Sequence, residues 1–386
     1  MIVKDEEEFL PRCLSSAKEA VDEIIVVDTG STDRTMEIAR DFGARVIEAA
    51  WVDDFSAVRN IGLEPAGGDW ILYLDADEEL EPDAVPLIRE AVENSEFEGY
   101  MLNIVNLQGE DPETATETTS PSPRLFRNKP RHRFRGIIHE QVTFDESKSG
   151  SIGMLAARVR HYGYLEPVKT ERQKSERNQE LLKTSDWSEE RTLVLAADEE
   201  LEQGKVDEAL EKYLRAYDHL IDKDLMHLPG IVLKIIYIHR VRGRREEALD
   251  WAAKGLARWP DYTDLEYLRA LTHFEAGDYQ AAIVSFMACI LLGETPSGYD
   301  SQEGVALWRA FQGLGLSYLG LNNKGVAAQA FMQALHYNNR DAISAGNLGE
   351  LYLSFGHDPA VVKTEMSKLV DAQTPEINDV FQRLFG

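Results

Sequence analysis

The order of apolar and polar residues divides the chain into two halves with different periods. Up to about residue 165, short apolar runs such as 24–27 and 70–74 alternate with stretches of helical spacing, and an aspartate follows each of these two runs. Continuous apolar runs of this length are typical of parallel strands covered by helices on both faces. Residues 33–40 have the spacing of a helix, with Asp33 as the expected N-cap. This alternation predicts an α/β domain.

Beyond about residue 190, the pattern is that of helices alone. A glycine or asparagine with an alanine five positions later recurs at Gly204, Gly243, Gly277 and Asn322. The step from Gly243 to Gly277 is 34 residues, and the step from Asn322 to Gly356 is 34 again. The step between Gly277 and Asn322 is 45 residues and contains the polar insert 293–300. A helix–turn–helix unit of 34 residues resembles tetratricopeptide (TPR) repeats, so we expect a solenoid of about four to five repeats.

These patterns predict three segments. An α/β domain covers residues 1–165, a charged helical linker covers 166–190, and a helical repeat domain covers 191–386. Within the first domain, residues 108–122 are acidic, rich in Thr, Ser and Pro, and poor in apolar side chains. We expect that stretch to be a mobile loop.

Composition narrows the classes of function. Of 386 residues, 41 are basic and 68 acidic, which gives a formal net charge of −27. This excess repels phosphate backbones and anionic lipid, so we expect neither nucleic acid nor a membrane as a partner. No apolar run is long enough to span a bilayer, and the acidic N-terminus does not resemble a signal peptide. The only cysteines, Cys13 and Cys289, lie far apart, which fits the reducing cytoplasm.

Carboxylates follow two of the expected strands. Asp75 and Asp77 come directly after the run 70–74, where open α/β sheets bind ligands. Paired carboxylates suit Mg²⁺ or Mn²⁺, which bridges a diphosphate; the alternative is a solvated turn within an acidic run. Asp28 follows the earlier strand, and its side chain can accept a hydrogen bond from a ribose hydroxyl or a base N–H. The alternative there is an ordinary capped turn before a helix.

Five blocks in this order resemble glycosyltransferase family 2 of the GT-A fold: MIVKDEE, DEIIVVDTGSTDRT, WVDDFSAVRN, GDWILYLDADEEL and FRGIIHEQV. With the repeats behind them, the chain resembles the TPR-containing branch, which includes sublancin-type peptide S-glycosyltransferases that modify a cysteine. The resemblance implies a Rossmann-like GT-A α/β domain followed by an all-α TPR solenoid. Family members usually have further apolar residues before the first block, whereas this chain starts at Met1, inside the expected first strand.

The resemblance also implies roles for single residues. The donor nucleotide and sugar would lie against Lys4, Asp5, Glu6, Asp28, Arg59, Asn60 and Asp75. A Mn²⁺ or Mg²⁺ ion would be held by Asp77, Asp75 and His161. Glu140 or His139 would remove the acceptor proton. The alternatives are that His161 is a core histidine, that His139 satisfies backbone groups, and that Glu140 pairs with Arg133 or Arg135.

The expected reaction is the inverting transfer of a hexose from a UDP-sugar. Concave repeat arrays hold peptide segments, so a peptide or protein side chain (Cys, Ser or Thr) is the expected acceptor. Repeat surfaces also commonly form homodimers. Two other functions stay open: a cell-surface polysaccharide glycosyltransferase, and a non-catalytic TPR scaffold with a vestigial nucleotide-binding domain.

Overall fold

The structure, a computed structural model, describes residues 1–94, 96–143, 152–166, 168, 189–223 and 227–386. It forms two compact units. The N-terminal unit comprises Met1–Asp222 and Ser297–Glu303, and the repeat unit comprises Lys223–Pro296 and Gly304–Gly386. The linker predicted over 166–190 lies almost entirely outside the described residues. Within the described ranges, no helix is both long enough and apolar enough to cross a membrane.

The first sheet of the N-terminal unit is parallel. Its strands β1 (Ile2–Val3), β2 (Ile25–Asp28) and β3 (Arg45–Glu48) lie in the order β1-β2-β3. Helices α1 (Leu10–Ala17) and α2 (Thr35–Asp41) connect them. The buried centre of β2 confirms the interpretation of the run 24–27 as a covered parallel strand. The same interpretation of the run 70–74 is wrong, because the strand Trp70–Leu72 pairs antiparallel with the strand Thr116–Arg127 and is only half-buried.

Helix α2 begins close to the predicted N-cap. Arg34 stands at the cap position, but the carboxylate of Asp33 accepts a hydrogen bond from the backbone N–H of Thr35 at 2.9 Å. Its second oxygen accepts one from the N–H of Glu7 at 3.0 Å. Asp33 therefore ties the start of α2 to the segment after β1.

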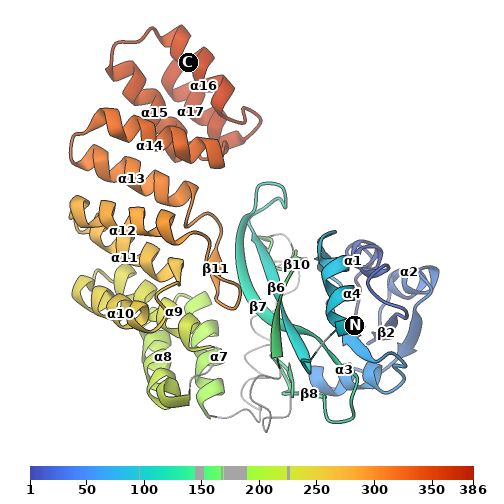
Figure 1. Cartoon of the computed structure of the whole chain (residues 1–386). Coiled ribbons are helices and arrows are strands. Elements are labelled where there is room, and N and C mark those ends of the chain that lie inside the picture. The colour runs from blue at the N-terminus through green and yellow to red at the C-terminus, as the bar shows by residue number, and fades with distance from the viewer. Residues whose placement is uncertain (95, 144–151, 167, 169–188, 224–226) are drawn as a thin grey trace. The chain divides into compact units, whose positions relative to one another are not determined.

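The second sheet is mixed, with strand order β11-β7-β6-β10-β5 and with β4 also paired to β7. Its strands are β4 (Trp70–Leu72), β5 (Glu78–Leu80), β6 (Gly99–Gln108), β7 (Thr116–Arg127), β10 (Ile152–His161) and β11 (Ser301–Gln302). Strands β6 and β7 form a long antiparallel hairpin (Figure 1). A separate small pair joins β8 (Phe134–Arg135) to β9 (Gln141–Val142).

The loop predicted over 108–122 is therefore wrong for most of its length. Residues 116–122 belong to β7 and pair with β6 on one side. On the other side, Thr118 and Thr119 pair with β11, which comes from the polar insert between two repeats. Threonine is a good strand residue, and backbone pairing on both sides compensates for the few apolar side chains. The composition alone gave no sign of the distant partner strand.

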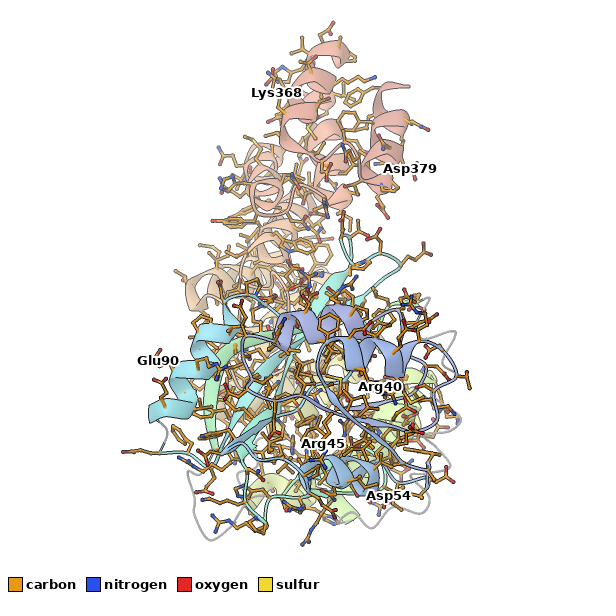
Figure 2. The ribbon with its side chains drawn as sticks, turned by 90° about the vertical axis from the view of Figure 1, so that its right-hand side faces the viewer. Arg40, Arg45, Asp54, Glu90, Lys368 and Asp379 are labelled. Atoms are coloured by element: carbon orange, nitrogen blue, oxygen red, sulfur yellow. The ribbon has the colours of Figure 1, made fainter. Side chains whose placement is uncertain are left out.

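Helix α4 covers the second sheet, and a capping side chain fixes the start of α3. Helix α4 (Ala84–Asn94) packs against β10, and Ile88, Leu102 and Val159 share one buried cluster. Helix α3 (Phe55–Leu63) starts at Asp54, whose carboxylate accepts the N–H of Ala57 at 2.9 Å (Figure 2). This cap fixes the start of the helix that carries Arg59 and Asn60.

Beyond residue 188 the described chain is almost entirely helical. The helices are α7 (Glu189–Glu202), α8 (Val206–Leu220), the 3₁₀ turn η1 (Ile221–Lys223), α9 (Leu228–Val241), α10 (Arg245–Arg258), α11 (Thr263–Glu275), α12 (Tyr279–Leu292), α13 (Trp308–Gly320), α14 (Lys324–Tyr337), α15 (Ala342–Ser354), α16 (Pro359–Leu369) and α17 (Pro375–Phe385). They pack in consecutive pairs from α7–α8 to α15–α16. The first pair belongs to the N-terminal unit, whereas α9 to α17 build the repeat unit.

The predicted repeat spacing corresponds to the turn inside each pair. Each turn contains a residue with positive φ, between +58° and +84°: Gly204, Gly243, Gly277, Asn322 and Gly356. Glycine adopts this left-handed conformation freely, and asparagine is one of the few other residues that tolerate it. The alanines five positions after the first four of these residues are fully buried. A turn residue and a small helix-contact residue therefore explain the 34-residue period.

We expect a sharp difference between two glycine-to-alanine changes in the repeat unit. A Cβ on Gly313 would lie 2.3 Å from the ring of Phe286, whereas a Cβ on Gly325 would meet nothing within 4 Å. G313A should lower the free energy of unfolding by about 1–3 kcal/mol through overpacking. G325A should be neutral or stabilise α14 by up to about 1 kcal/mol. Urea unfolding followed by circular dichroism measures both, and equal midpoints for the two variants would contradict this packing.

Candidate active site

The structure gathers the sequence-predicted residues from five elements. Asp28 ends β2, Asp75 and Asp77 follow β4, and His161 ends β10. Arg59 lies in α3, and His139 and Glu140 precede β9. Three of these side chains form one ion-pair group, and two others form a second pair.

Arg59 is the centre of the first group. Its Nη2 donates to Asp75 at 2.6 Å, and its Nε donates to Glu140. The Arg59 side chain is only 8% exposed, and its guanidinium lies 5.1 Å from the ring centre of Tyr73. Glu140 therefore pairs with Arg59, and the expected alternative of a pair with Arg133 or Arg135 is wrong. One buried cation joins the carboxylate after β4 to the carboxylate before β9.

A second arginine at this site was not predicted from the sequence. Arg124 of β7 forms an ion pair with Glu78, whose side chain is fully buried, and lies 3.6 Å from the other oxygen of Asp75. Glu78 in turn accepts the backbone N–H of Asp75 at 2.9 Å. Burial raises the pKa of Asp75, but the charges of Arg59 and then Arg124 outweigh it and hold the pKa well below its ordinary value. Only the pairing of β7 with β4, remote in sequence, brings Arg124 to Asp75.

The second pair joins Asp77 and His161. The Nε2 atom of His161 lies 3.6 Å from Asp77 Oδ2, and Asp77 is 4% exposed. The other ring nitrogen, Nδ1, lies 2.9 Å from the amide oxygen of Asn106. Because that oxygen only accepts, Nδ1 carries a proton, and the lone pair of a neutral ring is on Nε2. Burial lowers the pKa of His161, but the hydrogen bond and charge of Asp77 raise it above its ordinary value.

This pair suits a divalent cation. The Asp77 carboxylate and the Nε2 atom of His161 are neighbours, and the amide behind the ring fixes its orientation, as outer ligands do at metal sites. Within the described ranges, no group of three or more His, Cys, Asp or Glu side chains is arranged to hold a metal. The carboxylate of Asp75 is already paired with the guanidinium groups of Arg59 and Arg124. The residues therefore fit an ion that takes two ligands from the protein and the rest from a diphosphate and water, as Mg²⁺ commonly does.

Asp28 presents an unused acceptor at the end of β2. It is 1% exposed, and its Oδ1 accepts the N–H groups of Gly30 and Ser31, both at 2.9 Å. Its Oδ2 is buried and has no hydrogen-bond partner among the described residues. The turn that follows needs the φ of +105° at Gly30. A buried acceptor without a partner is costly unless a ligand supplies the donor.

The other residues that were predicted to bind the sugar donor form hydrogen bonds that stabilise the loop after β2 or the start of β8. Asp5 accepts the N–H of Thr32 at 2.7 Å, and the N–H of Glu6 donates to Thr35 Oγ1 at 2.7 Å. The neighbouring Lys4 is exposed. The side-chain amide of Asn60 donates to the backbone carbonyl of Phe134 at 3.0 Å and accepts its N–H at 2.9 Å. The side chains of Asp5 and Asn60 are thus occupied by hydrogen bonds to the backbone of Thr32 and Phe134.

His139 lies in a constrained backbone conformation beside Glu140. Its φ is +51°, in the left-handed region. Its carbonyl accepts a hydrogen bond from Arg191 of α7 at 3.0 Å. Burial lowers the pKa of the His139 side chain, although the charge of Glu140 opposes that shift. At neutral pH this imidazole is therefore uncharged.

Two segments of the chain match known protein families. Residues 1–154 match Glycosyl transferase family 2, and residues 233–297 match Tetratricopeptide repeat. A TPR repeat-containing protein of Synechococcus elongatus is 32% identical over 316 residues, which cover 67% of this chain and 75% of that protein.

Two further relatives share the N-terminal part. An uncharacterized glycosyltransferase of Rickettsia typhi is 30% identical over 42% of this chain and 58% of its own length. The SPbeta prophage-derived glycosyltransferase SunS of Bacillus subtilis is 29% identical over 46% of this chain and 42% of its own length. The chain thus matches only about half the length of these two relatives.

Replacing Arg59 tests the ion-pair group. R59L leaves two largely buried carboxylates without their shared cation, and breaking a buried pair in this way typically costs about 3–5 kcal/mol. We expect a corresponding drop in the urea midpoint at neutral pH. The control R34L removes a surface arginine, 66% exposed and paired with Glu37, and should leave the midpoint unchanged. Equal midpoints for R59L and the native chain would show that Arg59 does not hold the two carboxylates.

Proposed function

This chain belongs to glycosyltransferase family 2 and carries tetratricopeptide repeats, and from that premise we propose that it transfers a hexose from a UDP-sugar to a peptide or protein side chain. The transfer inverts the anomeric centre, and the repeats hold the acceptor. The observation that carries this proposal is the guanidinium of Arg59, which holds Asp75 on the donor side and Glu140 on the acceptor side.

The donor base and ribose lie at the end of β2. The buried Oδ2 of Asp28 accepts a hydrogen bond from the N–H of the uracil ring or from a ribose hydroxyl. Asp5 and Glu6 keep the loop after β2 in place through their bonds to Thr32 and Thr35. This supports a nucleotide with an N–H donor on its base, and UDP has one.

The diphosphate lies beside Asp77 and His161. These two side chains would hold a Mn²⁺ or Mg²⁺ ion, which neutralises charge on the departing diphosphate. Asn106 keeps the ring of His161 turned toward Asp77. Asp75 is already neutralised by Arg59 and Arg124, so its role is to fix these two guanidinium groups next to the donor.

Glu140 acts as the base on the acceptor side. The nucleophilic atom of the acceptor, sulfur or oxygen, gives its proton to Glu140 and forms a bond to the anomeric carbon. The bond from that carbon to the diphosphate oxygen breaks, and UDP leaves with the electron pair. The ion pair with Arg59 holds the Glu140 carboxylate in place on the acceptor side. His139, neutral and constrained, shapes the loop beside it.

The repeats supply the acceptor surface. Helix pairs stacked in this way form elongated surfaces that take extended peptides, which a small crevice cannot hold alone. A homodimer and a cytoplasmic location, both expected from the sequence, stay predictions.

Titration of UDP by calorimetry tests the donor site first. Binding should require Mn²⁺, disappear in EDTA, and be lost in D77N because one of two protein ligands is gone. The control D69N makes the same change at the exposed start of β4 and should bind like the native chain. Native protein that binds no UDP in either condition would support the scaffold function, and unchanged Mn²⁺-dependent binding in D77N would exclude the metal role of Asp77.

The proposed role of His161 as a metal ligand predicts how UDP affinity changes with pH. A proton and a metal ion compete for Nε2, and the pKa of His161 is raised above 6.5 by Asp77. Mn²⁺-dependent UDP affinity should be fully present above this pKa and should fall as the pH drops through it. H161Q should weaken binding and remove the dependence on pH in the range just above the ordinary histidine pKa. An unchanged pH profile in H161Q would mean that another group controls the affinity.

Two substitutions identify the base. E140Q should lower turnover about 10²–10⁴-fold with little change in UDP affinity. H139N is the matched variant, since asparagine tolerates the left-handed backbone at this position and should preserve the loop. Release of UDP from UDP-glucose, with water as the acceptor, measures both. A larger loss in H139N than in E140Q would make His139 the base.

A further inference from the structure

Helix α7 contributes one side chain to the loop before β9. Arg191 lies in the first turn of α7, and its Nη2 donates to the backbone carbonyl of His139 at 3.0 Å. Both residues belong to the N-terminal unit. Arg191 nevertheless lies beyond residues 1–154, the part of the chain that matches the glycosyltransferase family. The contact therefore joins the first helix of the helical half to the residue next to Glu140.

The loop that receives this bond contains two residues in the left-handed region of the backbone. Gly136 and His139 both have positive φ, +97° and +51°. For a residue with a Cβ, such a conformation persists only where the surroundings hold it. The carbonyl of Ile137 accepts the N–H of Phe55 at 2.9 Å, and Arg59 holds the side chain of Glu140. Arg191 provides the anchor between these two points.

The positive charge of Arg191 also suits a position near the Glu140 carboxylate. Burial lowers its pKa to about 10, against the opposing charge of Glu140, so the guanidinium stays protonated at neutral pH. Glu140 thus faces a direct cation partner in Arg59 and a second positive charge from α7. Asp198, also on α7, adds a negative charge near His139.

We propose that Arg191 is a positioning residue that fixes the His139–Glu140 loop and so completes the acceptor side of the site. The inference rests on the proposed function, in which Glu140 takes the acceptor proton. Without the bond to the His139 carbonyl, the loop relaxes and Glu140 meets the acceptor in the right orientation less often. Donor binding in the proposed function depends on Asp28, Asp77 and His161, which lie on β2, after β4 and on β10, so UDP affinity should stay unchanged.

The test uses the full chain and three variants. UDP release from UDP-glucose, with water as the acceptor, gives kcat and KM, and calorimetry gives UDP affinity. R191A should lower kcat about 10²-fold, the typical effect of a small misplacement of a catalytic group, with KM and UDP affinity unchanged. R191K should recover most of the rate, because an ammonium group donates to the same carbonyl. K205A removes a positive charge from an exposed position just before α8 and should match the native chain.

Hydrogen–deuterium exchange of residues 136–142 provides a readout independent of turnover. R191A should raise exchange there, whereas R191K and K205A should not. Native kcat in R191A would overturn the inference, and so would a joint loss of rate and UDP affinity that R191K does not restore. A native chain that neither binds UDP nor releases it from UDP-glucose would instead overturn the proposed function, and the inference with it.

Discussion

The site depends on one buried guanidinium shared by two carboxylates. Arg59 reaches Asp75 after β4 and Glu140 before β9 from a helix whose start is fixed by Asp54. Asn60, the next residue of α3, holds the backbone of Phe134 and so keeps β8 in place. Because loss of Arg59 leaves two carboxylates without their shared cation, fold stability and site geometry depend on the same side chain.

The charges around Arg59 alternate along a chain of contacts. Glu78 pairs with Arg124, Arg124 approaches Asp75, Asp75 pairs with Arg59, and Arg59 pairs with Glu140. Two cations thus serve three anions, and Arg191 offsets the surplus negative charge at the Glu140 end. Asp77 lies outside this chain of contacts and faces His161. An anionic diphosphate approaching Asp77 meets repulsion unless a cation arrives with it, which gives the proposed metal an electrostatic reason.

Local rules explain what could be predicted from the sequence. The strand at β2, the helix at α2 and the period of the repeats follow from apolar runs, capping and turn residues, each readable within a few neighbouring positions. The partners of Arg59 could not be predicted in the same way, because Glu140 lies 81 residues away. Arg124 was missed and 108–122 was taken for a loop for the same reason. Both errors concern strand β7, whose pairing with β4 and β11 cannot be predicted from composition.

The first helical pair has a different position in the molecule from the pairs that follow it. It shares the helix–turn–helix form and the left-handed turn residue of the other pairs, yet it is part of the N-terminal unit. Its helix α7 touches the loop of the proposed base through Arg191, and its charged residue Asp198 acts on His139. A repeat-like element thus contributes to the chemical site itself, in addition to any surface that the repeat unit offers to an acceptor. In the proposed function, the chain therefore does not divide cleanly into a catalytic half and a docking half, because the acceptor side of the proposed site takes residues from both patterns in the sequence.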